Sequence, residues 1–71
     1  MTDVREAIVR DARVEHRLHP EWRWGQTLFN VTSNLYPDLA NKVQGTMYDP
    51  FNQDSRADGF LDWVDREMTD E

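Results

Sequence analysis

Acidic side chains are concentrated in the segment DSRADGFLDWVD at residues 54–65, which has the length of a calcium-binding loop. In such loops, oxygen ligands occupy set positions and a bidentate glutamate stands at the twelfth. Here the third position is the cation Arg56, and the twelfth is Asp65, whose side chain is shorter than that of glutamate. Apolar residues also recur through the segment at helical spacing. We therefore expect a helix with solvated carboxylates rather than a calcium site.

Two histidines, His16 and His19, lie near Glu15 and Glu21 and resemble part of a metal site. Pro20 interrupts the helix that would place both imidazoles on one face, and the surrounding sequence offers no clear third ligand. We expect ordinary surface histidines and no bound metal.

Nucleophilic catalysis has no support in the sequence. The chain contains no cysteine, and neither Ser33 nor Ser55 lies in a motif that would activate its hydroxyl. A glycine-rich phosphate loop is also missing from the sequence. We predict a protein that is not an enzyme and uses no cofactor. The lack of cysteine fits a reducing compartment and excludes disulfides.

The charge of the chain is strongly asymmetric. The 71 residues carry 14 acidic and eight basic side chains, a net charge of −6. Residues 1–48 hold six acids and six bases, whereas residues 49–71 hold eight acids and two bases, so the whole excess lies in the last third. We expect no direct binding of nucleic acid, because the acidic end would repel phosphates. The sequence has no apolar run of membrane-spanning length, so a soluble cytoplasmic protein without membrane contact is expected.

The first predicted helix extends to about Leu18 and is capped by Thr2 or Asp3. Asp11 and Glu15 fall within its apolar arc, which is a poor pattern for deep burial. Three arginines, at positions 10, 13 and 17, line the opposite side. The apolar arc comprises Val4, Ala7, Ile8, Ala12, Val14 and Leu18.

The central predicted helix, Glu21–Tyr36, carries two apolar seams about 120° apart on a helical wheel. Gly25 within it predicts the close approach of another backbone or ring. A helix with two seams must be covered on both sides, so the second seam is a candidate partner surface. The first seam is Trp24, Leu28, Val31 and Leu35, and the second is Trp22, Phe29 and Tyr36.

A short helix, a loop and a last helix complete the predicted fold. A third helix at 38–44 ends at a left-handed Gly45, and a loop at 46–55 contains a Phe51 turn capped by Asp49. The last helix, capped by Asp54 or Ser55, extends to about Met68. We predict one all-α domain, residues 1–71, built as a small helical bundle of three principal helices and one short helix.

Two polar groups are further interaction candidates. Arg23, Gln26 and Asn30 share one flank of the central helix; alternatively, Gln26 or Asn30 ties down the backbone of the 45–56 loop. The second group is an acidic ridge on the last helix, which either solubilises the protein or imitates the phosphates of a nucleic acid. The ridge consists of Asp58, Asp62 and Asp65, continued by the acidic tail.

From Arg23 onward the chain carries a series of short motifs: RWGQ with LFN (23–30), PDLA (37–40), GT with DPF (45–51), and DSR with FLDW (54–63). In this pattern the chain resembles small acidic bacteriophage-encoded proteins of mostly unassigned function. The first helix (1–19) lies outside this pattern and is expected to be a variable addition to a core at 20–71. The resemblance implies action in the cytoplasm of a bacterial host and supplies no catalytic residues.

These observations predict a protein-binding module, phage-encoded, that inhibits or modulates a host protein such as a defence factor. Its partner surface would be the first helix, the second aromatic seam or the acidic last helix. The alternatives are a self-assembling homo-oligomer with a structural or scaffold role, or an acidic mimic of nucleic acid.

Overall fold

The computed structural model describes residues 3–69, and this part of the chain is helical without strands. It contains three principal helices, one short helix and a 3-10 turn, which confirms the predicted all-α bundle. The elements are α1 (Val4–Leu18), α2 (Trp24–Leu35), α3 (Pro37–Val43), η1 (Asp54–Arg56) and α4 (Ala57–Thr69). The expectations for Thr2 and for the acidic tail at 70–71 lie outside the described residues.

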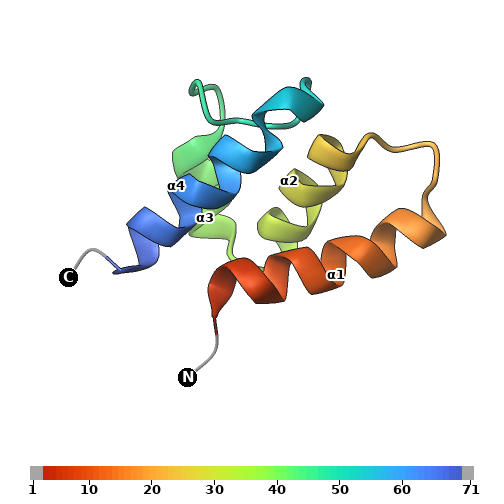
Figure 1. Cartoon of the computed structure of the whole chain (residues 1–71), viewed down its shortest axis with the longest axis horizontal. Coiled ribbons are helices and arrows are strands. Elements are labelled where there is room, and N and C mark those ends of the chain that lie inside the picture. The colour runs from red at the N-terminus through yellow and green to blue at the C-terminus, as the bar shows by residue number, and fades with distance from the viewer. Residues whose placement is uncertain (1–2, 70–71) are drawn as a thin grey trace.

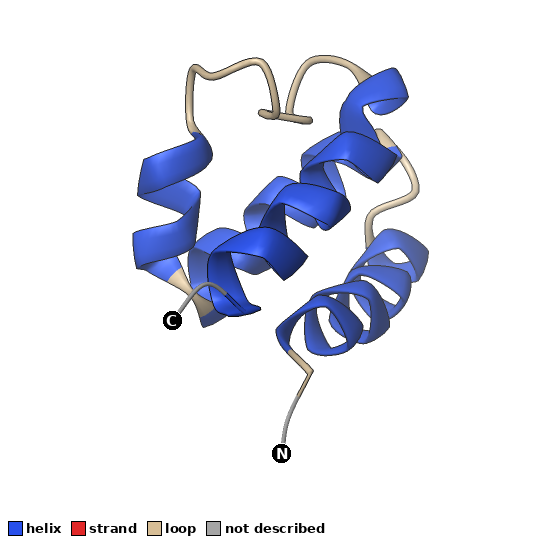
Figure 2. Ribbon diagram, turned by 60° about the vertical axis from the view of Figure 1, so that its left-hand side comes forward, coloured by secondary structure: helices blue, strands red, loops and turns tan. Residues whose placement is uncertain are grey.

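Helix α1 lies along one side of the molecule, and the loop between α3 and η1 lies at the opposite end (Figures 1 and 2). The helix begins where predicted, because the Asp3 carboxylate accepts hydrogen bonds from the backbone N–H groups of Arg5 and Glu6 at 3.0 and 3.4 Å. Two of the orphan donors at its N-terminus are thereby satisfied.

Helix α2 starts at Trp24, three residues later than the sequence predicts. The preceding segment forms a turn in which the Trp22 N–H donates to the His19 carbonyl oxygen at 3.0 Å. Arg23 is extended, with φ −69° and ψ 157°, and its side chain does not cap the helix. The expectation that Glu21 and Trp22 belong to the central helix is therefore wrong.

The cap of α2 comes instead from a distant part of the chain. Asp54 Oδ1 accepts a hydrogen bond from the Gly25 N–H at 2.9 Å. The prediction that Asp54 caps the last helix is wrong for the same reason: it lies in η1, and α4 begins only at Ala57. Gly25 is buried, and a Cβ atom there would overlap the carbonyl oxygen of Pro50, which confirms the predicted close approach of another backbone.

The loop after α3 follows its predicted turn chemistry. Gly45 is left-handed, with φ 81°. Both carboxylate oxygens of Asp49 accept backbone hydrogen bonds, from Gly45 at 2.9 Å and from Phe51 at 3.0 Å. One acidic side chain thus ties the end of α3 to the Phe51 turn.

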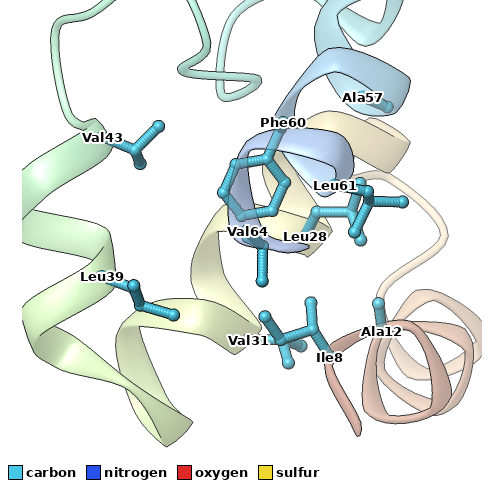
Figure 3. Close-up of a cluster of buried hydrophobic side chains, with 10 residues drawn as sticks. All are labelled: Ile8, Ala12, Leu28, Val31, Leu39, Val43, Ala57, Phe60, Leu61 and Val64. Carbon is cyan, nitrogen blue, oxygen red and sulfur yellow. The ribbon is translucent and has the colours of Figure 1, made fainter. Parts of the chain in front are cut away.

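One hydrophobic core draws residues from all four α-helices (Figure 3). Burial of this apolar surface is the main stabilising contribution to the fold. The core comprises Ile8 and Ala12 of α1, Leu28 and Val31 of α2, Leu39 and Val43 of α3, and Ala57, Phe60, Leu61 and Val64 of α4.

Two threonines of α2 are also fully buried, which the apolar pattern does not predict. The Thr27 hydroxyl donates to the carbonyl oxygen of Arg23 at 2.9 Å, and the Thr32 hydroxyl donates to that of Leu28 at 2.8 Å. Each hydroxyl donates to the carbonyl oxygen four residues earlier, so its burial does not leave an unpaired polar group.

Helix α1 is rotated relative to its predicted apolar arc. Ile8 and Ala12 are buried, but Val14 and Leu18, which were expected on the same arc, are 50% and 66% exposed. The side of α1 that contacts the bundle therefore centres on the line through Ile8, Ala12 and the half-buried His16.

Candidate protein-interaction surface

The second seam is not a stripe on one helix, because Trp22 precedes α2 and Tyr36 is the residue that follows it. Its ring stacks on that of His19, with centroids 4.0 Å apart and planes 10° apart. His16 Nε2 lies 3.1 Å from the Trp22 carbonyl oxygen, and the His16 ring meets Trp24 edge to face at 5.7 Å. The two histidines thus help to close the turn between α1 and α2.

The other two members of this seam pack within the chain. Phe29 is half-buried and meets Phe51 edge to face, with ring centroids 5.6 Å apart. Tyr36 is half-buried at the junction of α2 and α3, where it packs against the core. Helix α1 thus contacts Trp24 of the first seam through His16, and the Phe51 loop covers Phe29 of the second seam.

The polar flank of α2 is anchored through its first member. Arg23 Nη1 donates to the carbonyl oxygen of Asn52 at 3.0 Å, so an arginine and not Gln26 or Asn30 binds the loop. Within residues 3–69, the half-buried side chains of Gln26 and Asn30 form no hydrogen bond to another side chain or to the backbone. Arg23 therefore acts in the fold, and the two amides remain on the surface.

The acidic ridge of α4 is partly neutralised by α1. Arg5 Nη1 lies 3.1 Å from Asp62 Oδ1 and 2.7 Å from Asp65 Oδ2. The hydrogen bond to Asp65, followed by that to Asp62, raises the pKa of the Arg5 guanidinium above its ordinary value although partial burial opposes the shift. Asp58, the remaining member of the ridge, is exposed. A ridge with an internal cation is a poorer imitation of a phosphate track than the sequence predicts.

The calcium-loop reading of residues 54–65 fails on geometry, since helix α4 continues from Ala57 through the segment. Among the described residues, no group of three or more His, Asp or Glu side chains is arranged to hold a metal ion.

The outer face of α1 presents a different surface, which we define as Arg10, Arg13, Val14, Arg17 and Leu18. All five side chains are exposed. Within residues 3–69, the three arginines form no ion pair or side-chain hydrogen bond. A groove on this side of the molecule is lined by residues of the segment 3–17.

The periodicity of the sequence separates the arginine row from the apolar arc, but it includes Val14 and Leu18 in that arc. A helical wheel centred on Ile8 and Ala12 would have placed Val14 and Leu18 at least about 100° from the buried direction. The sequence did not determine how α1 is rotated about its own axis. The presence of Asp11 and Glu15 within the predicted apolar arc was a sign that not all of this arc faces the core.

The molecule is thus a small all-α domain with a basic and aliphatic helix face on one side and an acidic helix on another. Comparison of the chain with protein-family models, curated proteins and solved structures gives no match. Among the helices described at 3–69, none combines the length and the apolar character needed to cross a membrane.

Proposed function

We propose that this protein is a non-enzymatic protein-binding module and that the outer face of α1 is its docking surface. The observation that carries the proposal is the composition of that face. Three exposed arginines stand beside Val14 and Leu18, which are 50% and 66% exposed. Aliphatic groups beside cations provide both apolar area and charge selectivity, the combination that protein interfaces use.

The rigidity of α1 supports this choice. Its inner face is held by Ile8 and Ala12 in the core and by the ion pairs of Arg5 with α4. Because the backbone of the helix is fixed before binding, a partner would order only the outer side chains. The aromatic side chains of Trp22 and Phe29, in contrast, already have ring partners within the chain.

The resemblance to small acidic phage proteins suggests where the partner is found. On that basis we place the partner among the proteins of a bacterial host, with the chain acting as an inhibitor or modulator in the cytoplasm. Small non-catalytic phage proteins often act in this way.

The test compares capture of host proteins by three immobilised forms of the chain. The native chain and the variant R10Q/R13Q/R17Q differ only on the outer face of α1. A control variant, K42Q/R56Q/R66Q, removes the same charge from α3, η1 and α4. We expect the α1 variant to lose a partner that the native chain and the control retain. Circular dichroism verifies that all three are folded, and equal capture by the three forms would refute the proposal.

A further inference from the structure

We infer that the partner contacts the outer face of α1 through an acidic amphipathic α-helix. This inference rests on the proposed function and specifies the chemistry of the partner. The partner helix would carry three carboxylates within one i to i+7 span, together with aliphatic residues on the adjacent stripe. It would lie along α1, and its carboxylates would pair with Arg10, Arg13 and Arg17.

The contact between α1 and α4 is an internal example of this recognition. Asp62 and Asp65 stand three residues apart on α4, and both carboxylates reach the same nitrogen of Arg5, at 3.1 and 2.7 Å. An arginine on α1 therefore already binds carboxylates presented at helical spacing by a neighbouring helix. The outer face repeats the same donor at three positions.

The spacing of the arginine row matches a helix. Steps of three and four residues correspond to rises of about 4.5 and 6 Å along α1. Carboxylates at i, i+4 and i+7 of an antiparallel helix, or at i, i+3 and i+7 of a parallel one, repeat these rises. Alternate residues of an extended strand stand about 6.8 Å apart on one face. This spacing is longer than both rises of the arginine row, so the mismatch between a strand and the row grows with each residue pair.

The surroundings of the row favour protein carboxylates over nucleic-acid phosphates. Glu6 and Asp11 flank the arginines on α1, and residues 49–71 carry the whole net charge of −6. A polyanion that extends beyond residues 10–17 would also meet Glu6 and the acidic last third of the chain, whereas a short acidic helix along the row would meet only Asp11. Val14 and Leu18 add apolar contact that a phosphate backbone does not match.

The experiment uses two synthetic helical peptides of about 15 residues with the same composition. One carries glutamates at i, i+4 and i+7 beside a leucine stripe, and the other distributes the same residues around the helix. Binding to the native chain is measured by fluorescence anisotropy at low and at physiological salt. We expect the matched peptide to bind about tenfold more tightly than the distributed one at low salt. The difference in affinity between the two peptides should become smaller at physiological salt, because salt screens the glutamate–arginine ion pairs.

Variants of the chain locate the contact. Each single substitution in the arginine row, such as R13Q, is expected to lower the affinity for the matched peptide by up to about fivefold, which is the effect of losing one exposed ion pair. The triple variant R10Q/R13Q/R17Q should bind the matched and the distributed peptide with equal affinity. The variant K42Q/R56Q/R66Q should still bind the matched peptide more tightly. V14S/L18S should also weaken binding, because both side chains are exposed and their replacement leaves the core intact.

Three results would overturn the inference. The first is equal affinity for the two peptides, which would indicate only general electrostatic attraction. The second is tighter binding of a DNA oligonucleotide than of the matched peptide, with the same dependence on the arginine row. The third is a solution mass that rises with concentration and returns to that of a monomer in R10Q/R13Q/R17Q, which would assign the face to a second copy. If neither peptide binds while host-protein capture still depends on the arginines, the inference fails and the proposed function stands.

Discussion

The carboxylate of Asp54 caps the N-terminus of α2 by accepting the Gly25 N–H at 2.9 Å, across 29 residues of sequence. The same glycine lies so close to Pro50 that a side chain would overlap its carbonyl oxygen. The first turn of α2 is therefore fastened to the 50–54 segment by one hydrogen bond and one close backbone contact. This junction positions the loop that covers Phe29.

Gly25→Ala is expected to destabilise the protein. Its Cβ would meet the Pro50 backbone, which has no flexible side chain to move aside. Overpacking of this kind costs about 1–3 kcal/mol in the free energy of unfolding. Urea denaturation measures the difference. Gly59→Ala is the matched control, since its Cβ would find Tyr48 Cδ1 at an ordinary 3.9 Å and would gain up to about 1 kcal/mol from helix propensity. Equal effects of the two substitutions would contradict the close contact at Gly25.

Asp54→Ala should lower the unfolding free energy by about 1 kcal/mol, the usual cost of losing a helix cap. Asp54→Asn keeps an oxygen acceptor for the Gly25 N–H and should recover most of that loss. The neighbouring Ser55→Ala serves as the control, because Ser55 is exposed and does not cap α2. Thermal unfolding of the three variants compares their stabilities. If Asp54→Asn lost as much stability as Asp54→Ala, the result would argue against the cap.

Arg5→Gln should cost about 0.5–1 kcal/mol, because it removes two ion pairs that remain partly screened by solvent. The loss should shrink in high salt. The raised pKa of Arg5 means that its stabilisation is complete at neutral pH and disappears only as strongly alkaline solution deprotonates the folded form. Lys42→Gln should cost less, because Lys42 forms one ion pair, with Glu67 at 3.3 Å, and its side chain is more exposed than that of Arg5. Denaturant titrations at two salt concentrations test both expectations, and a salt-independent loss would exclude an electrostatic origin.

The rotation of α1 predicts a sharp contrast between two aliphatic residues of the same helix. Ile8→Ala should cost about 2–4 kcal/mol, because the side chain is fully buried. Val14→Ala should change stability by less than about 0.5 kcal/mol, because half of that side chain is exposed. The comparison is made by chemical denaturation. Similar losses at the two positions would mean that Val14 faces the core and is unavailable to a partner.

Local chemistry explains how much of the fold was predictable from the sequence. The Asp3 cap, the left-handed Gly45 and the Asp49 turn all satisfy backbone groups within four residues of the side chain or turn concerned. Helix content and the end of α1 before Pro20 follow from apolar periodicity and proline geometry in the same way. Even the close approach at Gly25 was indicated, since a glycine inside a helix requires a reason.

Tertiary contacts decided the rest. The start of α2 depends on the carboxylate of Asp54, 29 residues from its partner Gly25, and on the ring of Trp22 stacking on His19. The expectation that Trp22 continues the helical spacing of the aromatic seam was wrong for that reason, because α2 begins only at Trp24.

The candidate surface was likewise determined by the rotation of α1. Residue spacing alone placed Val14 and Leu18 on one arc with Ile8 and Ala12, and it left open whether the acidic ridge of α4 was free. Packing against α2 and the ion pairs from Arg5 settled both, because a helix can bury only the residues that face its neighbours. The sequence by itself determined the helices and their local caps, and the tertiary structure decided which of their faces remain exposed to a partner.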